Sequence, residues 1–273
     1  RRFDGNNLAE CYTELTRAAD YARKEGKPIL LEANTFRIRG HEEASGTKYY
    51  PEGIIEAWEQ RDPVDPYVEF LTDKGHITAE EVEARKADIQ KAIATALKAA
   101  ESEPEVVADA DHEVERLFRR DAPALRAPGS ETKELRFIDA ISEGLSTAME
   151  RHDELVLMGQ DIGHYGGVFE VTDGFVDRFG EDRVRNTPLC ESAIIGSGLC
   201  LSIAGMKAMV EMQFADFVTS GFNQIVNNLA KLHWRWGQQA DVVVRMPTGG
   251  GVAAGPFHSQ SNEAWFFHVP GLM

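Results

Sequence analysis

Glu191 stands where an apolar helix is predicted to begin, at the end of the segment Thr187-Pro188-Leu189-Cys190-Glu191. The residues that follow are apolar nearly all round, so this helix is predicted to be buried. A carboxylate at the mouth of a buried helix loses hydration and needs a partner that offsets the loss. One interpretation is a first-turn carboxylate that complements the helix dipole. The other is a functional glutamate, and the residues alone leave both open.

Two further places carry residues suited to proton transfer or anion binding. His258 lies in a Gly-rich loop after a predicted strand at 241–246, and an imidazole exchanges its proton near neutral pH. Such a histidine either serves catalysis or makes structural hydrogen bonds. His41 ends the segment Phe36-Arg37-Ile38-Arg39-Gly40-His41, which follows a predicted strand at 29–33. This segment is either a solvated basic loop or a contact for an anion.

Several common enzyme signatures are missing or stand in the wrong context. Residues 249–254 match the dinucleotide-binding pattern Gly-x-Gly-x-x-Ala, but Pro256 follows where a helix should begin. The sequence contains no Gly-x-x-x-x-Gly-Lys-Ser/Thr, no His-Glu-x-x-His and no Gly-x-Ser-x-Gly. Dinucleotide binding, nucleotide hydrolysis and the common hydrolase mechanisms therefore lack support.

The apolar pattern of the second half predicts an α/β unit that would position Glu191 and His258. Its strands and helices alternate, with strands expected at 155–158, 183–187, 208–214 and 241–246 and helices at 131–151, 191–204 and 217–236. Strands separated by helices imply a parallel sheet with helices on both faces. Functional groups then gather just past the carboxyl ends of the strands.

The first half is predicted to be mostly helical. Helices are expected at 7–24, 53–60 and 78–102, and the last opens with the capping-box pattern Thr78-Ala79-Glu80-Glu81. Acidic sequence with prolines follows, which is typical of a solvated connection between packed units. We therefore expect a first domain at 1–125, a linker at 126–131 and a second domain at 132–273.

Composition limits the classes of function. The 273 residues are 42% hydrophobic and 27% charged, which is typical of a globular protein. A formal net charge of −16 argues against a nucleic-acid surface, because phosphate binding needs clustered Lys and Arg. No apolar run is long enough to span a membrane. Three cysteines are too few for a disulfide framework, which favours a reducing compartment.

Both halves resemble parts of the thiamin diphosphate-dependent 2-oxoacid dehydrogenases. Segments similar to the β part occur in order at 159–163, 166–169, 183–191, 211–217, 223–227, 258–261 and 268–271. Asn186-Thr187-Pro188-Leu189-Cys190-Glu191 and Gln213-Phe214-Ala215-Asp216-Phe217 are most similar to the branched-chain member. Phe3-Asp4-Gly5-Asn6-Asn7 and residues 31–37 resemble the carboxyl-terminal part of the α chain. The resemblance implies a fused α/β arrangement.

The resemblance also implies the fold and the cofactor site. It implies a thiamin diphosphate-binding fold with a transketolase-like pyrimidine-binding domain, preceded by a mostly helical tail of the α-like domain. Glu191 would bond the pyrimidine N1′ of thiamin diphosphate, and three residues would flank that ring: Leu189, Gln213 and Phe217. His258 would lie near the reacting carbon from the β-like region, and His41 would contact the cofactor there from the α-like region.

The resemblance also implies sites for metal ions, and at Gln160 the sequence departs from the family pattern. Backbone carbonyls would hold a monovalent cation such as K⁺, at Ala240, Val242 and Val243. The segment that holds Mg²⁺ and the diphosphate would precede Arg1, and a further β-like domain would follow Met273. We therefore expect a fragment that is inactive alone. Gln160 stands where the family usually has Glu, so a proton network through this position is in doubt.

The implied activity is oxidative decarboxylation of a branched-chain 2-oxo acid, with acyl transfer to the lipoyl group of a dihydrolipoyl acyltransferase core. Such a protein would self-associate and work in a cytoplasmic multienzyme complex. One alternative is pyruvate or another 2-oxo acid as substrate. A second alternative, from a different class, is a non-catalytic binding or assembly fragment.

Overall fold

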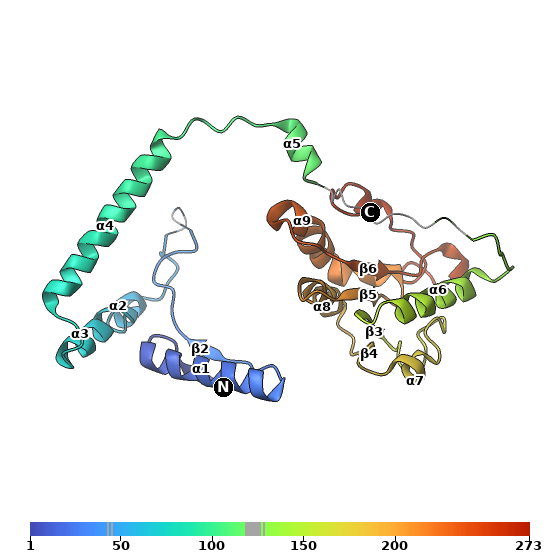
Figure 1. Cartoon of the computed structure of the whole chain (residues 1–273), viewed down its shortest axis with the longest axis horizontal. Helices are drawn as coiled ribbons and strands as arrows, with labels where there is room; N and C mark the ends of the chain where they lie inside the picture. The colour runs from blue at the N-terminus through green and yellow to red at the C-terminus, as the bar shows by residue number, and fades with distance from the viewer. Residues whose placement is uncertain (43, 45, 118–126, 128) are drawn as a thin grey trace. The chain divides into compact units, whose positions relative to one another are not determined.

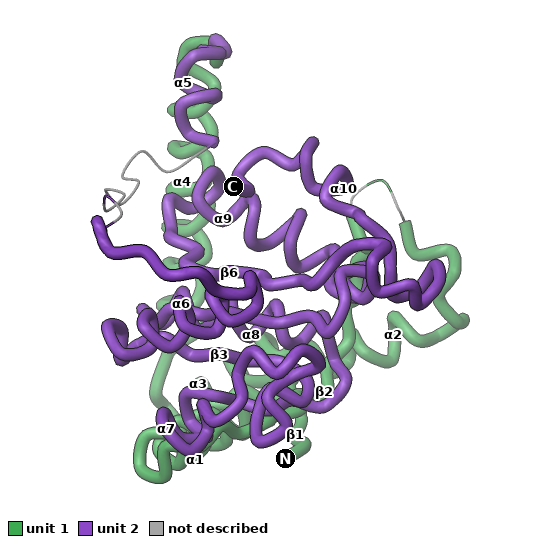
Figure 2. Tube along the Cα trace, turned by 90° about the vertical axis from the view of Figure 1, so that its right-hand side faces the viewer, with its two compact units in different colours: residues 1–106 green, residues 107–273 purple. Residues whose placement is uncertain are grey.

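The computed structural model describes residues 1–42, 44, 46–117, 127 and 129–273, which form two compact units. The first unit comprises Arg1–Val106 and the second Val107–Met273 (Figure 2). Residues 126 and 128 of the expected linker lie outside the described residues, so the expected boundary at 126–131 stays a prediction.

The first unit is mostly helical, as expected. β1 (Arg2–Asp4) pairs in parallel with β2 (Glu32–Asn34). Among its described residues, the helices are α1 (Leu8–Glu25), α2 (Ile54–Glu59), α3 (Asp65–Asp73) and α4 (Ala79–Ser102) (Figure 1). The capping box predicted for α4 is present, since Thr78 and Glu81 each bond the other's backbone N–H.

The strand expected at 29–33 was placed too early. The observed strand begins at Glu32, and Leu30 is 84% exposed. The strand begins at Glu32 because its pairing partner, β1, consists of Arg2–Asp4, and these residues pair with Glu32–Asn34. The apolar residues at 29–31, from which a buried strand was predicted, precede the observed strand.

The described part of the second unit is an α/β fold around a four-stranded parallel sheet. Its strands are β3 (Leu155–Gln160), β4 (Val184–Thr187), β5 (Lys207–Glu211) and β6 (Val242–Arg245), in the order β4-β3-β5-β6. All three strand pairs are parallel. The other elements are α5 (Ala110–Glu115), α6 (Phe137–Arg151), α7 (Phe175–Phe179), α8 (Glu191–Ile203), η1 (Ala215–Gly221), η2 (Gln224–Leu229), α9 (Ala230–Trp236), η3 (Gly250–Val252) and α10 (Ala264–Phe267).

Alternating strand residues build a core on each face of this sheet. Leu155, Leu157 and Met209 pack in one cluster with residues of α6 and α7. Ala208 and Val210 pack in the other cluster with residues of α8, η1 and η2. The predicted parallel sheet covered on both faces is therefore confirmed.

Two expected boundaries and one expected helix in this unit were wrong. The strand expected at 208–214 ends at Glu211, and the helix expected from 131 begins at Phe137. Arg136 precedes that helix and pairs with Asp139 in its first turn. The single helix expected at 217–236 is a 3₁₀ helix, a π-helical segment and α9 in succession. Close packing against α8 accounts for the irregularity, because Gly221 lies against Ile195.

The packing of α8 on the sheet predicts an effect of substituting Gly198. A Cβ atom there would lie 2.9 Å from Val210 Cγ1 and 3.3 Å from Val242 Cγ1. Gly198→Val should therefore lower the free energy of unfolding by about 1–3 kcal/mol through overpacking. Gly144 in α6 is the matched control, because a Cβ there would meet nothing within 4 Å. Gly144→Ala should be neutral or stabilising in the same urea denaturation experiment. Equal effects of the two substitutions would contradict this packing.

A second prediction concerns the ion pair between Glu211 and Arg245, whose side chains are 4% and 17% exposed. Burial raises the pKa of the Glu211 carboxyl above its ordinary value of 4.5, while Arg245 opposes the rise. Arg245→Met leaves the carboxylate buried without its cation, which costs about 3–5 kcal/mol when the group is ionised.

The loss should depend on pH in a defined direction. A carboxyl whose folded-state pKa is raised contributes its stability below the unfolded pKa and loses it as pH rises through the folded pKa. The stability difference between wild type and Arg245→Met should therefore be smallest below pH 4.5 and grow at higher pH. Adding Glu211→Gln should remove this pH dependence. A difference that is constant with pH in denaturation curves would refute the assignment.

Candidate functional site

Glu191 is the first residue of α8 and directly follows the turn after β4. Glu191 is 8% exposed, and its Oε1 accepts a hydrogen bond from Gln160 Nε2 at 3.2 Å. Gln160 is equally buried at the end of β3, where it is in register with Thr187 of β4. The partner that this carboxylate was predicted to need is therefore Gln160, a residue whose type departs from the family pattern and whose contact with Glu191 was not predicted.

The packing of α8 fixes this carboxylate in place. Ile194 and Ile195 are 1% and 0% exposed, and Gly221 of η1 lies against the Glu191 carbonyl. The helix is less buried than predicted on one side, where Cys200 and Ile203 are exposed. The carboxylate at its first turn also lies at the positive end of the helix dipole. The structural and the functional interpretation of Glu191 are therefore compatible.

An aromatic cluster surrounds His258. Its ring lies 5.1 Å from the Phe214 ring and 5.3 Å from the Phe217 ring, with interplanar angles of 84° and 80°. Phe214 also meets Phe169 edge-on at 5.8 Å. The structure thus brings together two predicted site residues, Phe217 and His258, that are far apart in sequence. Phe214 and Phe169 were missed as members of this cluster.

Of the other two residues expected near the pyrimidine, Gln213 is half-buried and Leu189 is exposed. Gln213 donates from Nε2 to Asp161 Oδ2 at 3.0 Å, and Leu189 is 80% exposed. Asp161 follows Gln160 directly and adopts a positive φ of 57°. Leu189 lies two residues before the buried Glu191, and its exposed apolar surface fits a residue that is covered only when something binds.

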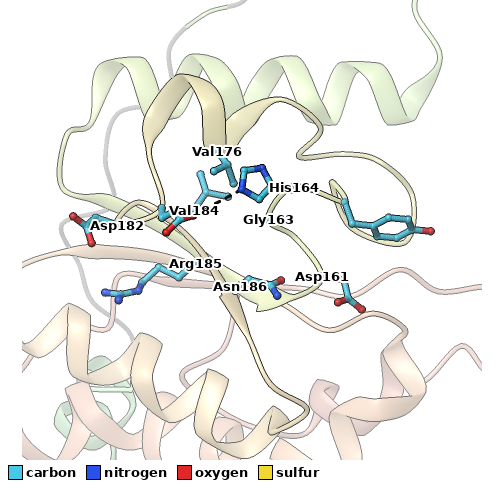
Figure 3. Close-up of a pocket in the computed structure, with 10 residues that line it drawn as sticks. Asp161, Gly163, His164, Val176, Asp182, Val184, Arg185 and Asn186 are labelled. Atoms are coloured by element: carbon cyan, nitrogen blue, oxygen red, sulfur yellow. Dashed lines mark ion pairs between the residues drawn. The ribbon is translucent and has the colours of Figure 1, made fainter.

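A hollow of about 450 Å³ is lined in part by Asp161 (Figure 3). It runs along β4 and the loop after β3, and His164 faces Val176 and Val184 there. Nε2 of His164 lies 3.8 Å from the carboxylate of Glu181. None of the predicted cofactor residues lines this hollow. It is therefore distinct from the place where Glu191 meets Gln160.

The predicted cation site lies at the start of β6, an edge strand of the sheet as described. The carbonyl of Ala240 accepts a hydrogen bond from Val242 N at 2.9 Å, and Val243 is 63% exposed. Within the described residues, no group of three or more His, Cys, Asp or Glu side chains could hold a metal ion. A site made of backbone carbonyls is not tested by that finding and stays a prediction.

His41 belongs to the first unit and is exposed. The loop before it is braced by Tyr50, whose hydroxyl donates to the Arg37 and Arg39 carbonyls at 3.0 and 3.3 Å. Hydrogen bonding with Tyr50 raises the pKa of the Arg37 guanidinium above its ordinary value. The expected place of His41 beside the site of the second unit stays a prediction, since each unit is described by itself.

In the part of the chain that the structure describes, no helix combines the length and apolar character needed to cross a membrane. All three cysteines are free.

Each half of the chain matches a known protein family. Residues 133–273 match the transketolase pyrimidine-binding domain, and residues 2–108 match the dehydrogenase E1 component. The 2-oxoisovalerate dehydrogenase subunit beta of Bacillus subtilis is 45% identical over 140 residues, which cover 50% of this chain and 43% of that protein.

Two other relatives cover similar shares. The mitochondrial 2-oxoisovalerate dehydrogenase subunit beta 2 of Arabidopsis thaliana is 43% identical, over 51% of this chain and 40% of the relative. The pyruvate dehydrogenase E1 component subunit beta of Leifsonia xyli is 39% identical, over 55% of this chain and 45% of the relative. The chain thus spans less than half the length of these relatives. It belongs to the family of transketolase-type pyrimidine-binding domains, here preceded in the same polypeptide by a dehydrogenase E1 component segment.

Proposed function

We propose that this chain takes part in the oxidative decarboxylation of a branched-chain 2-oxo acid, with thiamin diphosphate as cofactor and the lipoyl group of an acyltransferase as acceptor. The observation that carries the proposal is the buried carboxylate of Glu191, held by the Gln160 amide at the start of α8. The family to which residues 133–273 belong supports it.

The residues present fit the pyrimidine part of this cofactor. An aminopyrimidine ring offers a nitrogen that can share a proton with a carboxylate and two flat faces that favour aromatic contacts. Glu191 supplies the carboxylate, and Phe217 supplies an aromatic ring that is half-buried. Leu189 offers exposed apolar surface of the kind that a bound ring would cover.

Each side chain then has a role that its surroundings support. The thiazolium ring of the bound cofactor supplies the electron sink for loss of carbon dioxide. Glu191 holds a proton at pyrimidine N1′, and Gln160 keeps that carboxylate oriented through its Nε2–H. His258 orients the substrate or moves a proton during acyl transfer, from its position against Phe214 and Phe217. His41, in the E1 component segment, is proposed to contact the cofactor near the reacting carbon.

The substrate and the complex belong to the same proposal. Relatives named as 2-oxoisovalerate dehydrogenases favour the branched-chain substrate, while the pyruvate dehydrogenase relatives keep pyruvate as the alternative. The two family matches in one polypeptide support a fused α/β subunit. We further propose self-association, Mg²⁺ bound outside this span, and K⁺ at the backbone of Ala240, Val242 and Val243. The fused layout favours a cytoplasmic location.

Substitution of Glu191 tests the proposal. In the full-length protein, Glu191→Gln should lower kcat for 3-methyl-2-oxobutanoate about 100-fold or more, because an amide cannot supply the proton held by a carboxylic acid. The measurement follows cofactor-dependent reduction of an artificial electron acceptor. Glu154→Gln is the control, since that glutamate pairs with Lys207 at the opposite end of the sheet.

The wild-type substrate profile decides between the alternatives. Turnover that favours 3-methyl-2-oxobutanoate supports the branched-chain assignment, whereas turnover that favours pyruvate replaces the substrate and keeps the mechanism. Absence of turnover with pyruvate, 2-oxoglutarate and 3-methyl-2-oxobutanoate, despite bound cofactor, would favour the non-catalytic alternative.

A further inference from the structure

The loop at 247–262 that carries His258 is tied to the start of η1 by buried polar contacts. Asp216 is 7% exposed, and its Oδ1 accepts a hydrogen bond from the backbone N–H of Gln260 at 3.3 Å. Asn262 is 3% exposed and donates from Nδ2 to the Ala215 carbonyl at 2.8 Å. The N–H of Ala215 in turn donates to the Pro247 carbonyl at 2.8 Å. Both ends of the loop are therefore fastened to residues 215–216.

The same short segment holds the imidazole ring. Phe214 and Phe217 stand on either side of residues 215–216 in sequence, and both rings meet His258 edge-on. The loop is also closed on itself, because Thr248 Oγ1 donates to the Gln260 carbonyl at 2.7 Å. The place of the His258 ring thus depends on where η1 holds the loop backbone.

We propose that Asp216 is the positioning residue for His258. Its hydrogen bond to the Gln260 N–H keeps the loop against η1, so that the imidazole lies between the Phe214 and Phe217 rings. This inference rests on the proposed role of His258 in acyl transfer. Asp216 acts through the loop backbone, which its carboxylate bonds at Gln260.

The chemistry of Asp216 indicates how the variant should be chosen. Asp216 Oδ2 is buried and has no hydrogen-bond partner among the described residues. Only Oδ1 is thus engaged with the loop. Asp216→Asn keeps an oxygen at that position and changes only the atom without a partner, whereas Asp216→Ala removes the acceptor. A positioning role predicts that the asparagine variant retains function and the alanine variant does not.

A double-mutant cycle in the full-length protein with its acyltransferase partner tests the inference. The measured quantity is kcat for acyl transfer to the lipoyl group. Asp216→Ala should lower kcat about 10- to 100-fold, the cost of a reacting group displaced by about 1 Å. In a His258→Ala background it should cause no further loss, because the group that it positions is gone. Asp216→Asn should stay close to wild type, and KM for the cofactor should be unchanged.

Thr219→Val is the matched control within η1, since Thr219 Oγ1 donates its hydrogen bond to the Asp216 carbonyl at 3.2 Å and not to the loop. It should leave kcat unchanged. If Asp216→Ala does not fold, Asp216→Ser takes its place in the cycle, because it keeps a polar atom but withdraws it from Gln260.

The outcomes distinguish a failure of the positioning role of Asp216 from a failure of the proposed function. Losses that multiply when Asp216→Ala and His258→Ala are combined, or an asparagine variant as impaired as alanine, would overturn the positioning role. A wild-type protein that turns over no 2-oxo acid would instead overturn the proposed function on which the inference rests.

Discussion

Burial of the Glu191 carboxylate is the constraint on which the candidate site depends. A carboxylate withdrawn from water is costly unless it is hydrogen-bonded, and here the Gln160 amide supplies the bond. That bond requires β3 and β4 to be neighbours in parallel register, because Gln160 ends one strand and α8 begins just after the other. The hydrogen bond that stabilises the buried carboxylate therefore forms only with this order of strands in the sheet.

The second half of the site follows from the β5-to-β6 connection. The chain leaves β5 through Phe214 and Phe217 and returns after β6 in the loop that carries His258. Because β5 and β6 are parallel neighbours, their carboxyl ends lie together, and the aromatic and polar contacts of η1 can hold that loop. Glu191 and His258 thus reach the same end of the sheet by independent connections.

Part of this arrangement could be predicted from the sequence. Apolar periodicity identified the sheet strands, and an apolar helix after Thr187-Pro188-Leu189-Cys190 placed Glu191 correctly. Contacts between distant segments could not be predicted in this way. Gln160 was recognised only as a departure from a family pattern, and nothing in its neighbourhood of the sequence pointed to Glu191. The division of the expected helix at 217–236 into η1, η2 and α9 was missed because its cause, Gly221 packed on Ile195, is a tertiary contact.

The central claim, that Glu191 bonds the pyrimidine N1′, is tested most directly by calorimetry with two ligands. Thiamin diphosphate and an analogue with carbon in place of N1′ would be titrated, with Mg²⁺, into the full-length protein and into Glu191→Leu. The account predicts that wild type binds the analogue about 10- to 100-fold more weakly, the worth of a hydrogen bond to a charged group. The variant should bind both ligands alike. Equal discrimination by wild type and variant would contradict the assignment of Glu191.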